Sequence, residues 1–290
     1  MFFFSADGLT PIKGKRMKSA VIQGFEAGWD NSHYPRIKGV ILMIKVMSQN
    51  VMCWEHEEIG SFANRRPLMK KALTEHGADI IGVQEFTPTW EEFLKEDLAG
   101  FEYINKYRKV DNLEGTPIFW NPEKVTALES GWFWLSETPE VESLGWDARC
   151  YRITCWVLFE EKQTGKRFAF VNTHLDHRGE TARQEGIKLV CKFIGEKFGA
   201  DLPLVLTGDF NATPDSQTIV TANSLLCDSC TVAEVTDDGH TFHGFGKAEI
   251  IIDYVYLSKN ISCKKYERVI EQNGQSIQSD HYGVMATIEL

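Results

Sequence analysis

An acid and an amide stand two residues apart directly after an apolar run, in the segment 206–211, LTGDFN. In an extended segment, alternate side chains share a side, so Asp209 and Asn211 lie together while Phe210 points into the core. Gly208 permits a sharp turn or a close approach of the backbone. A carboxylate can orient or deprotonate a water, and an amide can donate to a developing oxyanion. The pair therefore suits a hydrated metal and a phosphate, although Asp and Asn also favour tight turns.

Further polar residues stand at or near the ends of apolar, β-type runs. They are Asn50, Glu85, His174, Asp253, Asp280 and His281. Polar groups placed repeatedly at strand ends indicate one site assembled from several strands. Glu85 suits a direct ligand of Mg²⁺ or Mn²⁺, hard ions that prefer carboxylate oxygen and water, but it could instead cap the helix expected after it.

The elements that would hold these residues alternate between strands and helices. Apolar alternation predicts strands, and apolar residues at helical spacing predict helices. Strands are expected at 44–51, 80–84, 103–107, 117–120, 125–134, 153–160, 167–173, 204–207, 251–257 and 284–288, and helices at 66–76, 90–98, 181–198 and 217–223. Mixed strands with helices outside them predict a layered α/β (α+β) domain.

Five short motifs resemble, in their order along the chain, those of the endonuclease/exonuclease/phosphatase superfamily, which includes deoxyribonuclease I. They are QE (84–85), NTHL (172–175), GDFN (208–211), IDY (252–254) and SDH (279–281). One tripeptide is a weak signal, but five in order over residues 41–290 are specific. The resemblance implies a four-layer sandwich of two packed mixed β-sheets flanked by helices, as in deoxyribonuclease I.

The resemblance also implies catalytic roles. Asp209 would align or activate the attacking water, and Asn211 would hold that water and the phosphoryl oxygen. Asp253 would keep His281 protonated, and His281 would stabilise the pentacovalent phosphate or assist the leaving group. His174 would donate to a phosphate oxygen or act as an acid, although a strand-end His can also serve the backbone.

The metal set implied by the resemblance adds two residues to Glu85. Asn50 would bind Mg²⁺ or Mn²⁺ through its amide oxygen, and Asp280 would bind or orient the same ion. The family often has an aromatic residue before this Asn, whereas Gln49 stands here. A strand-end Asn forming a local turn is the alternative for Asn50.

Candidate substrate contacts lie elsewhere in the chain. Arg149 and Arg152 precede an expected strand and suit bidentate contact with phosphate, though a structural or surface role explains them equally well. His243, in the segment 241–245, is predicted to contact the leaving side of the substrate. Three tryptophans could stack on a base, but core packing is the better explanation. They are Trp132, Trp134 and Trp146.

Two patterns suggest zinc instead. The segment 172–177, NTHLDH, differs by one residue from the HxHxDH signature of metallo-β-lactamase-like hydrolases, with Asn172 in place of the first His. That signature leaves GDFN and SDH unexplained. Cys227 and Cys230 form a lone CxxC, which lacks the second pair or the histidines of a zinc ribbon. We expect neither to hold zinc.

Composition limits the classes of substrate and the cell compartment that fit this chain. The formal net charge of −10 argues against tight non-specific binding of nucleic acid without metal. Seven cysteines without a framework indicate a reducing compartment, hence the cytoplasm. No apolar run is long enough to span a membrane, no feature indicates a protein partner, and we expect a monomer. Residues 1–42 lack a sustained period and a convincing secretory signal, and we expect an extension ahead of a domain at 43–290.

These observations predict a Mg²⁺- or Mn²⁺-dependent phosphoesterase that hydrolyses phosphodiester bonds, in a nuclease-like manner, by in-line attack of water on phosphorus. Two alternatives remain open. The substrate could be a small sugar phosphate or a phospholipid head group, because no basic stripe or amphipathic membrane helix is visible. The chain could also be a non-catalytic binding relative, although every expected polar position of the site is filled.

Overall fold

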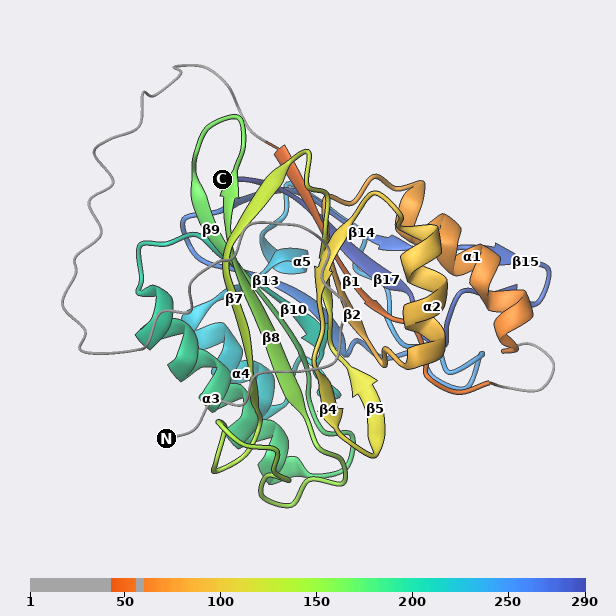
Figure 1. Cartoon of the computed structure of the whole chain (residues 1–290), viewed down its shortest axis with the longest axis horizontal. Coiled ribbons are helices and arrows are strands. Elements are labelled where there is room, and N and C mark those ends of the chain that lie inside the picture. Colours follow the sequence, from red (N-terminus) through yellow and green to blue (C-terminus); the bar gives the residue numbers. More distant parts are fainter. Residues whose placement is uncertain (1–42, 56–59) are drawn as a thin grey trace, which may run out of the picture. The chain divides into compact units, whose positions relative to one another are not determined.

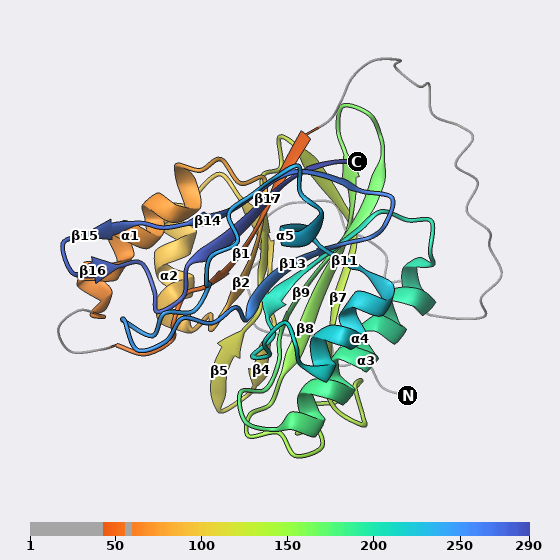
Figure 2. The same ribbon diagram turned by 180° about the vertical axis from the view of Figure 1, so that it is seen from behind.

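Two mixed β-sheets lie face to face, and helices cover the outer face of each (Figure 1, Figure 2). The structure is a computed structural model and describes residues 43–55 and 60–290. The extension expected at 1–42 lies outside the described residues. The fold class predicted from the sequence, a four-layer sandwich of the deoxyribonuclease I type, is confirmed.

The first sheet has seven strands in the order β12-β14-β17-β1-β2-β6-β3. β1 runs parallel to β2 and antiparallel to β17. The strands are β1 (Met43–Asn50), β2 (Ile80–Gln84), β3 (Glu102–Ile104), β6 (Ile118–Trp120), β12 (Val235–Thr236), β14 (Ser262–Val269) and β17 (Gly283–Glu289).

The second sheet has six strands in the order β11-β13-β10-β9-β8-β7. β9 and β10 are parallel, and β13 is antiparallel to β10. The strands are β7 (Val125–Trp134), β8 (Ile153–Glu161), β9 (Arg167–His174), β10 (Leu204–Asp209), β11 (Cys227–Asp228) and β13 (Asp253–Leu257). Two small ladders pair β4 (Tyr107–Lys109) with β5 (Asn112–Gly115), and β15 (Gln272–Asn273) with β16 (Ser276–Ile277).

Alternation along each strand divides its side chains between two apolar layers. Ile44 of β1 and Phe168 of β9 belong to the core between the sheets. Met47 of β1 packs against the helices at 62–74 and 88–97, which cover the first sheet. Ala169 of β9 packs against the helices at 180–198 and 217–225, which cover the second. Each strand of the centre is therefore buried on both faces, which fixes the register that brings polar strand ends together.

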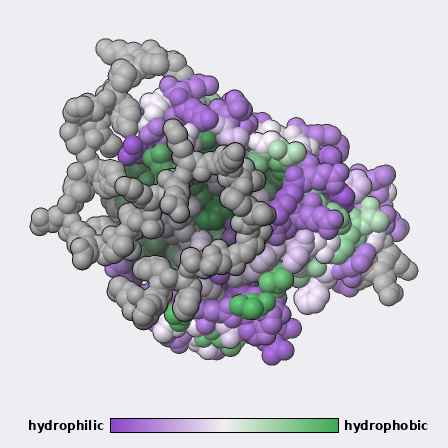
Figure 3. All heavy atoms as spheres, in the orientation of Figure 1, coloured by the Kyte–Doolittle hydropathy of each residue, from purple (hydrophilic) through white to green (hydrophobic). Residues whose placement is uncertain are grey.

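The helices begin with the sequence signals that favour helix starts. α1 (Phe62–Thr74) follows Ser61, whose side chain accepts a hydrogen bond from the N–H of Asn64. α2 (Pro88–Asp97) has Pro88 in its first turn. The second sheet is covered by α3 (Glu180–Phe198) and α4 (Gln217–Leu225), and α5 (Ser229–Val232) is a single short turn. Hydrophilic side chains gather over α2 and lie among apolar ones over α1 (Figure 3).

The long central elements agree with the prediction, but several shorter ones were not predicted: β5, β11, β12, β15, β16 and α5. The strand expected at 103–107 is divided between β3 and β4, which belong to different sheets. β14 was not predicted, because its charged residues hide the alternation and a bulge between Cys263 and Lys265 shifts the register. No helix among the described residues is long and apolar enough to cross a bilayer.

Candidate active site

One edge of the sandwich collects strand ends from both sheets. β1 and β2 end there, and so do β9 and β10. β13 and β17 run in the opposite direction and begin at this edge. Most of the predicted site residues stand at these ends: Asn50 on β1, Glu85 after β2, His174 on β9, Asp209 on β10, Asp253 on β13 and His281 before β17.

Asp209 is the point at which these side chains meet. Its Oδ2 accepts a hydrogen bond from Asn50 Nδ2 at 3.0 Å, which joins the two sheets. His174 Nε2 lies 3.3 Å and His281 Nε2 3.9 Å from the same oxygen. The backbone N–H of Asn211 donates to the other carboxylate oxygen at 2.9 Å. Because Asp209 is 1% exposed, these groups act on it in a medium of low dielectric.

The electrostatics of Asp209 suit proton transfer. Burial, and next the charge of Asp253, raise the pKa of Asp209 to about 7. A carboxyl group with a pKa near neutrality can accept a proton from water and later release it. A bound divalent cation would favour the ionised form. The structure therefore places at the centre of the site a carboxylate that can serve as a base.

Asp253 and His281 form a buried pair. His281 Nδ1 lies 2.8 Å from Asp253 Oδ2, and Thr241 Oγ1 donates to the same oxygen at 2.7 Å. Burial opposes a charge on the imidazole, but Asp253 outweighs it and raises the pKa of His281 well above its usual value. The charged form of His281 is therefore favoured, with Nδ1 held by Asp253 and Nε2 on the side of Asp209.

A divalent cation fits the acidic part of this edge. Glu85, His174 and Asp209 offer ligand atoms that all lie within 4.8 Å of one another. Burial alone would raise the pKa of Glu85, but hydrogen bonds from Cys53 and Asn50 and the charge of His281 outweigh it and lower that pKa. Ionised carboxylates crowded in a buried place repel each other, and a hard cation such as Mg²⁺ or Mn²⁺ would offset that repulsion.

The other two predicted metal ligands have partners of their own. Asn50 Oδ1 accepts the N–H of Met52 at 2.8 Å, while Asn50 Nδ2 also donates to Glu85 Oε1 at 3.1 Å. Asp280 Oδ1 lies 4.0 Å from His281 Nε2, and burial raises the pKa of Asp280. Both side chains stand beside the proposed cation position, and their roles as direct ligands stay predictions.

His174 is surrounded by ionic groups, of which sequence reasoning named Arg152 but missed Glu114 and Arg108. Its Nδ1 lies 3.9 Å from Glu114 Oε1, which Arg108 binds directly and Arg152 approaches to 3.7 Å. Burial, then Arg152 and Arg108, lower the pKa of His174 well below its usual value. A neutral imidazole can donate a hydrogen bond to phosphate but brings no positive charge.

Backbone strain is concentrated at this edge. Glu85, Asn211 and Met52 have φ values of 59°, 49° and 55°, in the left-handed region that favours glycine. Such residues persist only where the surrounding structure holds them, and they often mark functional sites. Asn211 is fixed by its side chain, whose Nδ2 donates to the carbonyl of Leu175 at 3.1 Å and lies 3.1 Å from His174 Nε2.

The predicted substrate contacts differ in their accessibility. Arg149 is exposed. Arg152 is 5% exposed and engaged with Glu114 and with His177, whose Nδ1 lies 3.2 Å from Arg152 Nη2. His243 is buried, stacks on Tyr282 with ring centroids 4.5 Å apart, and accepts the N–H of Phe245. The structure thus brings Arg152 to the site as a neighbour of His174, and substrate contact by any of the three stays a prediction.

The structure gives Asn172, which replaces the first histidine of the rival zinc signature, a different task. It is fully buried between the sheets. Its Nδ2 donates to the carbonyls of Val83 and Pro117 at 2.8 and 3.0 Å. Its Oδ1 accepts from Gln84 Nε2 at 2.7 Å and Thr207 Oγ1 at 3.1 Å. Asn172 therefore bridges the sheets with all of its hydrogen-bonding capacity used.

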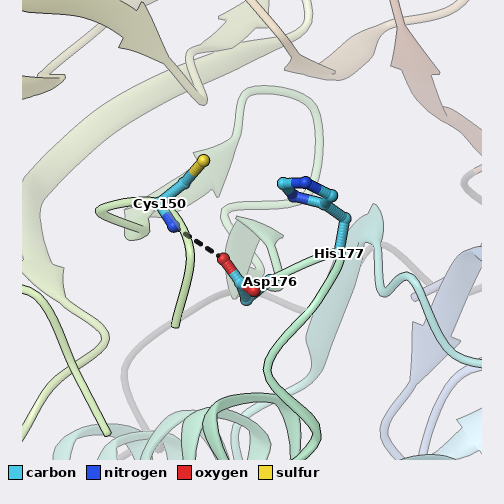
Figure 4. A group of neighbouring side chains, drawn as sticks. All are labelled: Cys150, Asp176 and His177. Atoms are coloured by element: carbon cyan, nitrogen blue, oxygen red, sulfur yellow. Dashed lines mark hydrogen bonds between the residues drawn. The ribbon is translucent and has the colours of Figure 1, made fainter. Parts of the chain in front are cut away.

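Cys150, Asp176 and His177 lie together beside the site (Figure 4). The carboxylate of Asp176 accepts the N–H of Cys150 at 2.9 Å and the N–H of Gly179 at 2.7 Å. Burial alone would raise its pKa, but these backbone bonds lower it to about 2. Arg152 lies next to the cluster, with Nε 3.7 Å from Asp176 Oδ2, and would repel a cation. Asp176 thus ties two loops together.

The remaining sequence candidates have structural surroundings. Cys227 and Cys230 are free thiols, like the other five cysteines. Trp134 is buried and donates through Nε1 to the carbonyl of Arg108 at 2.8 Å, whereas Trp132 is 44% exposed. Packing therefore explains Trp134, as expected.

Similarity to known proteins agrees with this geometry. The Endonuclease/Exonuclease/phosphatase family matches residues 63–281. An uncharacterised protein of Acanthamoeba polyphaga mimivirus is 30% identical over 85% of this chain and 100% of its own length. An endonuclease/exonuclease/phosphatase of Bacteroides vulgatus is 31% identical, with a TM-score of 0.80 over 86% of this chain and 99% of its own. The mannosyl-6-phosphatase of Bacteroides thetaiotaomicron is 32% identical, with a TM-score of 0.77 over 84% of this chain and 99% of its own.

The family match covers most of the chain and contains the strand-end residues from Glu85 to His281, whereas Asn50 precedes it. The chain belongs to the endonuclease/exonuclease/phosphatase family.

Proposed function

We propose that this protein is a Mg²⁺- or Mn²⁺-dependent phosphoester hydrolase that acts by in-line attack of water on phosphorus, and that its substrate is a small phosphomonoester such as a sugar phosphate. The observation that carries the proposal is the convergence on Asp209, whose Oδ2 lies within 4 Å of nitrogen atoms of Asn50, His174 and His281. A base, hydrogen-bond donors and an acidic cation position are thereby combined in one buried place.

The division of labour follows from the surroundings of each group. Asp209 orients the attacking water and takes its proton, because its carboxylate is held by the Asn211 N–H and its pKa lies near neutrality. His281 donates a hydrogen bond from Nε2–H to a phosphoryl oxygen and contributes positive charge, which Asp253 sustains. As the bond between phosphorus and the leaving oxygen breaks, that oxygen takes up a proton from water. His174, being neutral, donates a hydrogen bond only.

Glu85, with Asn50 and Asp280 beside it, would hold the cation. When bound, a divalent ion would neutralise charge that develops on the phosphoryl oxygens.

The substrate class rests on two further observations. The mannosyl-6-phosphatase is among the solved structures above 30% identity, and it matches along 99% of its length. The net charge of −10 disfavours a long polyanion, which would need a basic footprint. Hydrolysis of phosphodiesters, which the motifs shared with deoxyribonucleases predict, is the competing proposal.

The test compares phosphate release from mannose 6-phosphate with cleavage of bis-p-nitrophenyl phosphate, in Mg²⁺, Mn²⁺ and EDTA. We expect metal-dependent release from the monoester, abolished by Asp209→Ala with folding intact. Cleavage of the diester alone would overturn the substrate class but not the hydrolase. Turnover of neither substrate with either metal, or full activity of Asp209→Ala, would refute the proposed mechanism.

A further inference from the structure

Arg65, on the first turn of α1, is the most deeply buried arginine of the described residues, and the mechanism does not use it. Its side chain is fully buried. The guanidinium donates four hydrogen bonds: Nε to the carbonyl of Gly60 at 2.8 Å, Nη1 to that of Val51 at 2.7 Å, and Nη2 to those of Met52 at 3.2 Å and Trp54 at 2.7 Å. Three of the four acceptors belong to the segment 51–54, which follows β1.

These four bonds go to backbone carbonyls rather than to a carboxylate. Burial of a guanidinium is costly unless its donors are satisfied. Burial lowers the pKa of Arg65 to about 10, so the group stays charged at neutral pH. The negative charges of Asp280 and Glu85 act on it from the site. The buried, charged guanidinium of Arg65 therefore binds mainly the backbone of segment 51–54.

The same segment contacts the metal site through its N–H groups. The N–H of Cys53 donates to Glu85 Oε2 at 2.7 Å. The N–H of Met52 donates to Asn50 Oδ1 at 2.8 Å. The carbonyls of segment 51–54 therefore face Arg65, while its N–H groups hold Glu85, the proposed ligand, and Asn50, the donor to Asp209.

Trp90 on α2 reinforces this arrangement. Its Nε1 donates to the carbonyl of Met52 at 3.0 Å, so that one oxygen accepts from both helices. The ring of Trp90 also lies under the Arg65 guanidinium, 5.3 Å from its central carbon. Met52 has a φ of 55°, a conformation that needs such external support.

We propose that Arg65 is a positioning residue of the metal site: it fixes segment 51–54, whose N–H groups orient Glu85 and Asn50 for the cation. The inference rests on the metal requirement of the proposed function. Groups that hold metal ligands in place are worth about 10–100-fold in metal affinity or activity. Lysine can keep the charge of Arg65 but cannot reach four carbonyls from one rigid plane.

The experiment measures binding of Mn²⁺ to metal-free protein from the electron paramagnetic resonance signal of free Mn²⁺. We expect Arg65→Lys to weaken Mn²⁺ binding about 10–100-fold, and Trp90→Phe, which removes only the Nε1 donor, to weaken it less. The matched control is Ile194→Ala, at a buried position of α3 on the outer face of the other sheet. It should lower the melting temperature and leave Mn²⁺ affinity unchanged.

Mn²⁺ affinity equal to wild type in both Arg65→Lys and Trp90→Phe would overturn the inference, whatever happens to the melting temperature. If Arg65→Lys does not fold, Trp90→Phe alone decides in the same way. An equal loss of affinity in Ile194→Ala would show that general destabilisation is the cause, and would also overturn it. Wild-type protein that binds no Mn²⁺ would refute the proposed metal requirement and this inference together. If the wild type binds Mn²⁺ tightly, the metal requirement stands and the variants test the role of Arg65 alone.

Discussion

Replacing Asp253 with Asn should uncouple His281 from its charge partner without changing the shape of the site. At an effective dielectric of about 20, unit charges about 4 Å apart interact by about 4 kcal/mol. His281 Nδ1 and Asp253 Oδ2 are 2.8 Å apart, and both residues are nearly fully buried. Asp253→Asn removes this attraction and should therefore lower the pKa of His281 towards its ordinary value.

The consequence for catalysis follows from the sign of that shift. A histidine whose pKa is raised keeps its proton as the pH rises through neutrality, and Asp253→Asn removes this advantage. His281 would then lose its proton at a lower pH and bring less positive charge to the phosphate. We expect kcat to fall about 100- to 10,000-fold, the usual range for loss of acid–base assistance. The fall should be smaller at pH 5 to 6, where His281 regains its proton.

The assay combines two measurements. Nuclear magnetic resonance follows the imidazole of His281 during a pH titration of metal-free protein, with the spectrum of His281→Gln as the assignment. Steady-state phosphate release gives the pH profile of kcat. Asp79→Asn is the matched control, since Asp79 is also buried but precedes β2 at the end opposite Glu85, where it accepts the N–H of Lys45. Unchanged titration of His281 in Asp253→Asn, or an equal loss of activity in Asp79→Asn, would refute the electrostatic argument.

Four other perturbations test the remaining links. The pKa of Asp209 is about 7 in the folded protein and about 3.9 in the unfolded chain. Its ionised form therefore opposes folding fully above pH 7, and this cost declines as the pH falls from about 7 to about 3.9. In EDTA at pH 8, Asp209→Asn should therefore raise the free energy of unfolding by about 1–3 kcal/mol, and equal stabilisation at pH 4 by urea titration would contradict this. Glu85→Gln should raise the Mn²⁺ concentration needed for half-maximal activity, and an unchanged titration would remove Glu85 from the cation. Asn172→Ala should lower the free energy of unfolding by about 2–5 kcal/mol, because it orphans buried partners on both sheets, while leaving Mn²⁺ binding intact; a loss of metal binding at equal stability would contradict its structural role. A chain that begins at Met43 should retain activity and melting temperature, and a large drop in either would show that residues 1–42 are required.

The pattern of apolar residues along the sequence was sufficient to predict the central strands of both sheets. The central strands are buried on both faces, and their apolar runs can be read from neighbouring residues alone. Polar residues at the ends of such runs, like Asp209 and Glu85, are conspicuous in the sequence because ionisable side chains are unusual beside a strand that is shielded from solvent. β14 lacked that signal, since its lysines and its bulge obscure the alternation. Arg152 was singled out for phosphate, whereas the structure shows it engaged with Glu114 and His177.

The sequence by itself was therefore enough to identify the acids, amides and histidines at the strand ends. The spacing that marks them lies within short motifs and does not depend on distant parts of the chain. Only the tertiary structure decided that Asp209 Oδ2 is shared by Asn50, His174 and His281, residues that come from three different strand ends. It alone brought in Glu114, Thr241 and Arg65, which no local pattern marks. Those contacts join residues distant along the chain, and they exist only because the packing of two sheets and their helices fixes how each element faces its neighbours.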